Sequence, residues 1–138
     1  MRYILVNAGP ILAATLAAFV FGAAWYGALA KPWMRAARLD GAELRPSLLL
    51  YLFVIACEAW IAAILAGALI LAPVEAGGWT VALGSAFIIW VGFVLPVIAV
   101  NHRYQRLPWT LTAIDAGHWL GAMLLMSAVL RAIGVEGP

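Results

Sequence analysis

Three ionisable side chains, Glu58, Asp115 and His118, lie inside long apolar stretches of this sequence. Carboxyl and imidazole groups can pass protons along a relay, and the same groups are ligands for iron, manganese or zinc. An unpaired charge in hydrocarbon costs at least about 2.5 kcal/mol, so each group must be paired, neutral or hydrated. These residues therefore indicate a proton relay, a metal site or a set of hydrogen bonds that joins helices.

Four apolar runs must position these residues, and they cover 3–30, 47–72, 76–100 and 107–130. Each run is long enough to cross the hydrocarbon core as a helix, which takes about 20 residues, and too long for a strand. The chain is 67% hydrophobic and 10% charged, which excludes a water-soluble monomer and a disordered chain. We predict an all-α fold in which residues 1–138 form one integral membrane domain, a bundle of four transmembrane helices.

Basic residues are shared unequally between the two ends of this bundle. Arg2 and Arg131 lie at the end of the termini, and the other basic residues lie in the first and third connections, namely Lys31, Arg35, Arg38, Arg45, Arg103 and Arg106. The positive-inside rule places these connections in the cytoplasm and both termini outside. Within the first connection, the run from Trp33 to Leu39 predicts a short amphipathic helix on the membrane surface.

Helical spacing groups the polar residues of the second and fourth runs. Asp115 and His118 are three residues apart and can touch, and Thr112 extends their stripe by one turn. Tyr51 and Glu58 share one face of the second run. Counted from the cytoplasmic ends of their runs, Glu58 and His118 lie at depths of about 16 Å and about 15 Å. We expect the two faces to meet, with the carboxyl group of Glu58 against the imidazole.

Small residues and one proline predict how the spans are shaped. Gly117 and Gly121 form a Gly-x-x-x-Gly step on the fourth run, which favours close packing against a neighbouring helix and makes this run the central one. Pro96 lies inside the third run and predicts a kink there.

Three functions remain open on these observations. The absence of a reaction motif favours a non-enzymatic accessory or structural subunit of a membrane complex, in which Glu58, Asp115 and His118 only join helices. The first alternative is a small proton-coupled transporter or carrier that uses these three residues. The second is a membrane metalloenzyme acting on lipid or quinone, which would need at least three ligands.

The remaining expectations concern ligands and partners. We predict no catalytic residue, no bound metal and no cofactor. The expected partners are the lipid bilayer and either further copies of the chain or a larger membrane complex. A net charge of +2 is too weak for nucleic-acid binding.

Several short motifs resemble a known family. The segment Gly22-Ala23-Ala24-Trp25-Tyr26, followed by Lys31-Pro32-Trp33-Met34, resembles the first-span signature of the bacterial domain-of-unknown-function family seventeen-sixty-one. Gly92, Pro96, Asn101 and the segment Asp115-Ala116-Gly117-His118 resemble it too. Its members are small four-span inner-membrane proteins without an established activity. The resemblance implies this fold and location, so both termini are expected in the periplasm. It also implies a shared pattern that includes Trp25, Tyr26, Asn101, Asp115 and His118; Glu58 is not placed in it.

Overall fold

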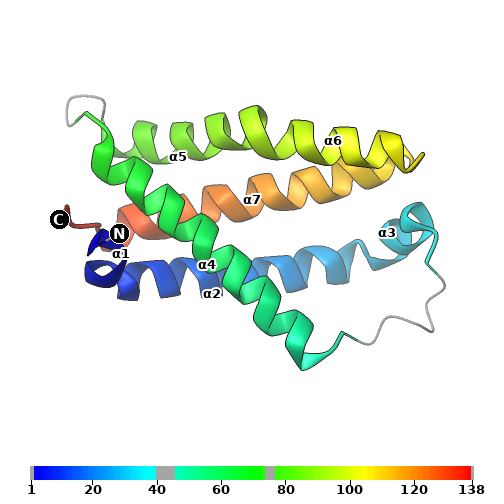
Figure 1. Ribbon diagram of the computed structural model, residues 1–138, viewed down its shortest axis with the longest axis horizontal. Helices are drawn as coiled ribbons and strands as arrows, with labels where there is room; N and C mark the ends of the chain where they lie inside the picture. The colour runs from blue at the N-terminus through cyan, green and yellow to red at the C-terminus, as the bar shows by residue number, and fades with distance from the viewer. Residues whose placement is uncertain (1, 40–45, 74–76, 138) are drawn as a thin grey trace.

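The computed structural model describes residues 2–39, 46–73 and 77–137, and its elements are helices (Figure 1). Four segments are long and apolar enough to cross a membrane. They are α2 (Ala8–Ala28), α4 (Leu48–Leu71), the continuous segment Gly78–Tyr104 and α7 (Trp109–Ile133). Two short helices, α1 (Arg2–Val6) and α3 (Ala30–Ala37), flank α2. The predicted all-α, four-span architecture is confirmed, and the chain is a multi-pass membrane protein.

Prolines set the ends of the N-terminal helices. Pro10 has no N–H to donate to the carbonyl of Val6, and the chain turns at Asn7 between α1 and α2. Pro32 likewise cannot donate to the carbonyl of Ala28, and α2 gives way to α3 at Leu29. The missing hydrogen bonds therefore separate three helices along a sequence that is apolar almost throughout.

The third span contains a widened turn where a kink was expected. It consists of α5 (Gly78–Ile89), the π-helix η2 (Trp90–Val94) and α6 (Leu95–Tyr104). Pro96 is the second residue after η2. The N–H of Leu95, just before it, donates to the carbonyl of Trp90, five residues back. The wide turn accommodates the proline ring without ending the helix. This span runs past the predicted end at residue 100, so it carries His102 and Arg103; its predicted start at residue 76 lies outside the described residues.

The surface helix expected from Trp33 to Leu39 is the helix α3, which starts earlier and ends at Ala37. Arg38 follows in the left-handed conformation, with φ 58°, and its guanidinium donates to the carbonyl of Arg106 at 3.0 Å. This hydrogen bond joins the first connection to the third at one end of the bundle (Figure 1). Arg45, which entered the orientation argument, lies outside the described residues.

The helix α7 is the centre of the bundle, as the Gly-x-x-x-Gly step predicted. It packs against α2, α3, α4, α5 and α6, and it carries more buried residues than any other described helix. A Cβ atom at Gly117 would lie 3.2 Å from the indole of Trp25, and one at Gly121 would overlap the ring of Phe21. The aromatic rings of α2 therefore occupy the space that the two glycines leave free.

The helix α4 crosses the bundle obliquely (Figure 1). Its central alanines Ala62, Ala63 and Ala66 are buried against the other helices. Its first six residues, 48–53, are each at least 43% exposed, although four are leucines. The N-terminal part of α4 therefore lies at the periphery of the bundle, where most of its apolar side-chain surface is exposed.

Both termini lie at the same end of the bundle, and Asn7 ties them together (Figure 1). Its side chain is 1% exposed. The amide donates to the carbonyl of Glu136 at 2.9 Å and accepts from the N–H of the same residue at 2.8 Å. Because both groups of the amide are bonded to one backbone unit, the C-terminal residues are held against the start of α2.

Candidate functional site

Three tryptophan side chains converge on three successive residues of α7. The indole of Trp25 on α2 donates to the carbonyl of Ile114 at 3.2 Å, and that of Trp90 in η2 donates to the carbonyl of Ala116 at 2.8 Å. These carbonyls face two different neighbours of α7, and a carbonyl oxygen has a second lone pair for such a bond. The third indole belongs to Trp33 and reaches the side chain between them, Asp115.

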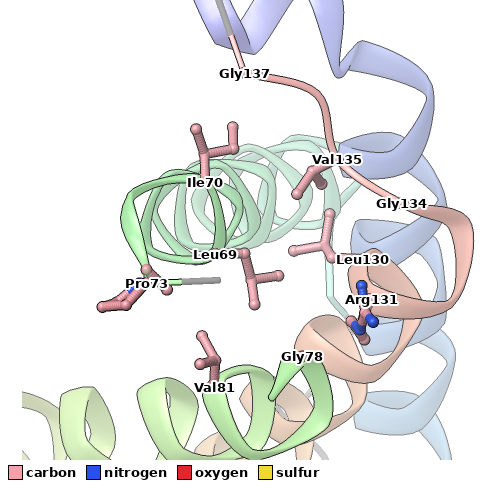
Figure 2. A pocket seen from close by; sticks show the side chains of 11 residues that line it. Leu69, Ile70, Pro73, Gly78, Val81, Leu130, Arg131, Gly134, Val135 and Gly137 are labelled. Carbon is pink, nitrogen blue, oxygen red and sulfur yellow. The ribbon is translucent and has the colours of Figure 1, made fainter. Parts of the chain in front are cut away.

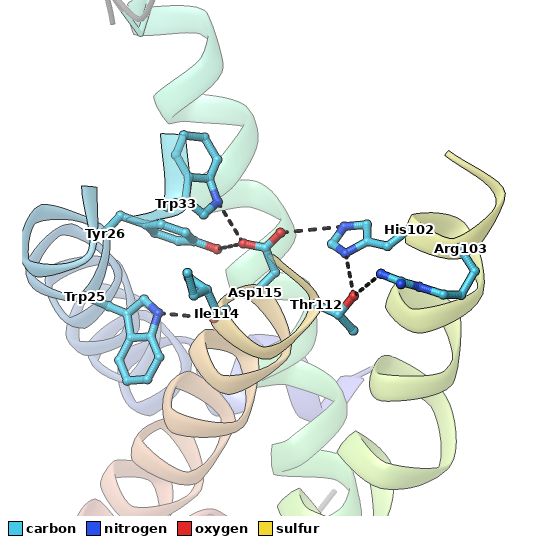
Figure 3. Close-up of polar contacts among 8 residues, drawn as sticks. All are labelled: Trp25, Tyr26, Trp33, His102, Arg103, Thr112, Ile114 and Asp115. Carbon is cyan, nitrogen blue, oxygen red and sulfur yellow. Dashed lines mark hydrogen bonds and ion pairs between the residues drawn. The ribbon is translucent and has the colours of Figure 1, made fainter. Parts of the chain in front are cut away.

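The carboxylate of Asp115 joins four helices (Figure 3). Its Oδ1 accepts from the hydroxyl of Tyr26 on α2 at 3.0 Å and from the indole of Trp33 on α3 at 2.9 Å. Its Oδ2 lies 3.6 Å from Nε2 of His102 on α6. Donors from three other helices thus surround one acceptor on α7, and hydrogen bonds to an ionised acceptor are about twice as strong as neutral ones.

A second chain of polar contacts runs from His102 toward the end of the bundle. Nδ1 of His102 lies 3.1 Å from the hydroxyl oxygen of Thr112, which also accepts a hydrogen bond from Nη2 of Arg103 at 3.1 Å (Figure 3). One proton arrangement satisfies these contacts, with Arg103 donating to Thr112, Thr112 donating to Nδ1, and the Nε2–H facing Asp115. We call the set Tyr26, Trp33, His102, Thr112 and Asp115 the Asp115 cluster.

His118 lies one turn further into the bundle in an aromatic box. Its ring is 4.8 Å from that of Tyr26, 6.1 Å from that of Phe21 and 5.2 Å from that of Trp119, measured between centroids. A Cβ atom at Gly22 would lie 2.8 Å from its Nε2, so the box closes only around a glycine. Within the described residues neither ring nitrogen has a hydrogen-bond partner, and the side chain is 5% exposed.

The expected contact of Glu58 with His118 is not made, and this part of the prediction is wrong. The carboxyl group is buried, and its Oε2 finds no partner among the residues that the structure describes. On either side of Glu58, α4 contacts the first span through Tyr51 against Phe19 and through Ala63, whose carbonyl accepts from Tyr3.

These neighbours explain why Glu58 and His118 do not lie at the same level, although the sequence predicted that they would. Glu58 lies alongside the part of the first span between Tyr3 and Phe19, whereas His118 lies beside Gly22 and Tyr26. Equal depths counted along two helices become equal positions only when the helices are parallel to one another, and α4 is oblique (Figure 1). Tyr51 makes no hydrogen bond with the Asp115 cluster in the described part of the chain and packs edge-on against Phe19.

Of the other predicted site residues, some belong to the Asp115 cluster or support it, and one lies outside it. Thr112 and Tyr26 belong to the Asp115 cluster, and Trp25 supports it through the backbone of α7. Asn101 is exposed on α6. His102 and Trp33 were missed as partners of Asp115, because His102 lies beyond the predicted end of the third run at residue 100 and Trp33 was placed in the surface helix. The available signal was the shallow position of Asp115, about 10 Å inside its run, which interfacial side chains can reach.

Metal binding by Glu58, Asp115 and His118 finds no support in this arrangement. Across residues 2–39, 46–73 and 77–137, no group of three or more histidine, cysteine, aspartate or glutamate side chains is placed to hold a metal ion. Glu58, Asp115 and His118 therefore do not form the three-ligand site that the metalloenzyme hypothesis required.

Two cavities lie near opposite ends of the bundle, and neither is lined by Glu58, Asp115 or His118. One cavity of about 360 Å³ lies at the end of the termini, between the ends of α4 and α7 and the start of α5 (Figure 2). Its walls include Leu69, Leu130 and Arg131. A groove of about 460 Å³ lies at the other end, on α6. One of its lining residues, Arg103, donates a hydrogen bond to Thr112 of the Asp115 cluster.

Comparison with known proteins bears on the whole chain. No curated protein and no solved structure matched this chain. A family model matches residues 10–131, which include all four spans except the first residues of α2 and the last of α7. The matched family is described as "Protein of unknown function (DUF1761)". The resemblance seen in the motifs is thereby confirmed, and the chain belongs to the family DUF1761.

Proposed function

We propose that this protein is a non-enzymatic accessory subunit of a membrane complex in the bacterial inner membrane. The observation that carries the proposal is the convergence of three indoles on residues 114–116, together with the donors around Asp115. These polar groups form hydrogen bonds with one another and with the backbone of α7. Such a network favours a single arrangement of the helices over chemistry on a bound substrate.

The proposed partner surface is the N-terminal part of α4. Residues 48–53 are each at least 43% exposed, and Phe53 is 64% exposed, while Tyr51 also packs against Phe19. A transmembrane helix of a larger partner could pack against these side chains and bury them, since close van der Waals contact drives helix association in lipid.

Site-specific photo-crosslinking in living cells tests this proposal. A photoreactive residue at Leu49 or Phe53 should give an adduct with one and the same membrane protein. The matched control is Val97 on α6, which is 59% exposed and should give no such adduct. Adducts of equal yield from all three positions, or none with protein from any, would contradict the proposal.

We propose that both termini lie in the periplasm. Lys31, Arg35 and Arg38 belong to the end of the bundle that carries α3, together with Arg103 and Arg106, whereas Arg2 and Arg131 lie at the opposite end (Figure 1). Alkaline phosphatase fused after Gly137 should be active and green fluorescent protein fused there should be dark; the reverse result would exclude this orientation.

A second candidate function is proton-coupled transport, and a different observation favours it. Both nitrogens of His118 and Oε2 of Glu58 are buried without a partner in the described part of the chain. An unsatisfied polar group in hydrocarbon costs several kcal/mol, which water or a transported proton would relieve. The partly exposed Asp115 and His102 could connect His118 to the aqueous side.

Proton flux in proteoliposomes separates the two functions. A carrier should acidify vesicles that contain a pH-sensitive dye, and the variants Asp115→Asn and His118→Ala should abolish this flux. The variant Tyr51→Phe is the control, because Tyr51 packs against Phe19 and is not among the described partners of Asp115 or His118. Flux that is no greater than in empty vesicles, or that survives in both variants, removes the carrier hypothesis.

A further inference from the structure

An open groove of about 460 Å³ lies on the lipid-facing side of α6, where this helix ends and α7 begins. It is lined by Ala99 and Val100, which lie about one helical turn further into the span, and by Arg103, Tyr104 and Trp109. Tyr104 is 87% exposed and Trp109 is 65% exposed. The groove thus leads from an apolar strip within the span to one cationic group between two exposed aromatic rings.

The guanidinium of Arg103 is held in place before any ligand arrives. Its Nη2 donates to Thr112 at 3.1 Å, and its Cζ lies 4.0 Å from the centre of the Trp109 ring. Its Nε is buried, and neither it nor the rest of the guanidinium is paired with a carboxylate among residues 2–39, 46–73 and 77–137. A fixed cation loses little conformational entropy when it binds an anion, and the planar guanidinium suits phosphate oxygens.

The position of the groove defines which anion it suits. Tryptophan and tyrosine side chains mark the level of the lipid headgroups, and Trp109 and Tyr104 flank Arg103 at that level. An apolar strip directly below a headgroup-level cation matches the shape of a phospholipid, with a phosphate above an acyl chain. A soluble phosphate would use the cation but not the strip formed by Ala99 and Val100.

We propose that this groove binds a phospholipid with an anionic headgroup. Its phosphodiester lies on Arg103, its glycerol region between Tyr104 and Trp109, and one acyl chain along Ala99 and Val100. Because Arg103 also donates to Thr112, the bound lipid is linked to the Asp115 cluster through one hydroxyl group. This inference does not rest on the accessory role proposed above.

Native mass spectrometry of the full chain, purified in a mild detergent, tests the inference. Phosphatidylglycerol should form a one-to-one adduct at about fivefold lower concentration than phosphatidylcholine, as expected for one basic residue at the surface. Arg103→Gln should remove this preference. The matched control is Arg35→Gln, which deletes an exposed charge on α3 at the same end and should leave it unchanged.

A second variant protects the test against a folding defect in Arg103→Gln. Val100→Trp fills the groove from an exposed position and leaves the contact between Arg103 and Thr112 in place. It should weaken the phosphatidylglycerol adduct at least as much as Arg103→Gln. Equal adducts with both lipids, adducts unchanged in Val100→Trp, or displacement of the lipid by millimolar inorganic phosphate would each overturn the inference.

Discussion

Replacing Asp115 by alanine is expected to lower the free energy of unfolding by about 2–4 kcal/mol. The change removes the acceptor of the Tyr26 hydroxyl and of the Trp33 indole, and each buried donor left without a partner costs about 1–3 kcal/mol. The side chain of Asp115 is 20% exposed, so water can reach part of the site and the sum stays below the upper limit. The loss is measured by thermal unfolding in detergent, monitored through the rate at which the single cysteine, Cys57, is alkylated.

Two further variants show whether the loss arises from the hydrogen bonds. Tyr26→Phe removes one donor to Asp115 and should cost about 1 kcal/mol in the wild-type background. In the Asp115→Ala background the same change should cost almost nothing further, because the acceptor is already gone. Tyr51→Phe removes a hydroxyl of the same chemistry from a residue that packs only against Phe19 among the rings described, and it should change nothing measurable. An Asp115→Ala protein as stable as the wild type would show that the carboxylate does not join the helices.

Replacing Gly121 by valine is expected to cost about 3 kcal/mol, the upper part of the range for overpacking a core. A Cβ atom at this position would overlap the ring of Phe21 and lie 2.8 Å from its Cε1. The ring cannot move far, because Trp25 lies 5.7 Å from it, centroid to centroid, and contacts Gly117. The helices α2 and α7 must therefore separate, and this is the most extensive interface in the bundle.

The control for this prediction is Gly84→Val on α5. A Cβ atom at Gly84 meets nothing within 4 Å, so the unfolding free energy should change by no more than about 0.5 kcal/mol. Phe21→Ala in the Gly121→Val background should recover part of the lost stability, because it removes the group that valine strikes. Additive losses in the double variant would mean that the two side chains do not meet.

The positions of Glu58 and His118 show the limit of estimating depth from the number of residues along each helix. Glu58 and His118 were expected at the same depth, yet Glu58 lies beside the stretch between Tyr3 and Phe19, and His118 lies beside Gly22. The count was sound for each helix, but it contained no information on the angle between α4 and α7. That angle depends on which side chains of α2 and α5 the alanines of α4 meet.

The partners of Asp115 show the same limit for residues far apart in the chain. Trp33 was placed in a surface helix, and His102 lay beyond the predicted end of the third run. Both residues lie near the end of the bundle, but both also turn toward Asp115. Trp33 reaches it because Pro32 ends α2 and starts a new helix at a different angle. His102 reaches it because the third span continues through the π-turn before Pro96. Both backbone features are local, but their consequences appear only when the helices pack.

Hydrophobic segments and the segregation of charge were enough to predict four spans, their approximate limits and a central fourth helix. Transfer of apolar side chains from water to lipid depends on composition and length, which are properties of each segment alone. The pairing of Asp115 with Tyr26, Trp33 and His102, and the isolation of Glu58 and His118, depend on helix tilt and rotation. Those are set by contacts between side chains from all the helices at once, so they exist only in the packed molecule.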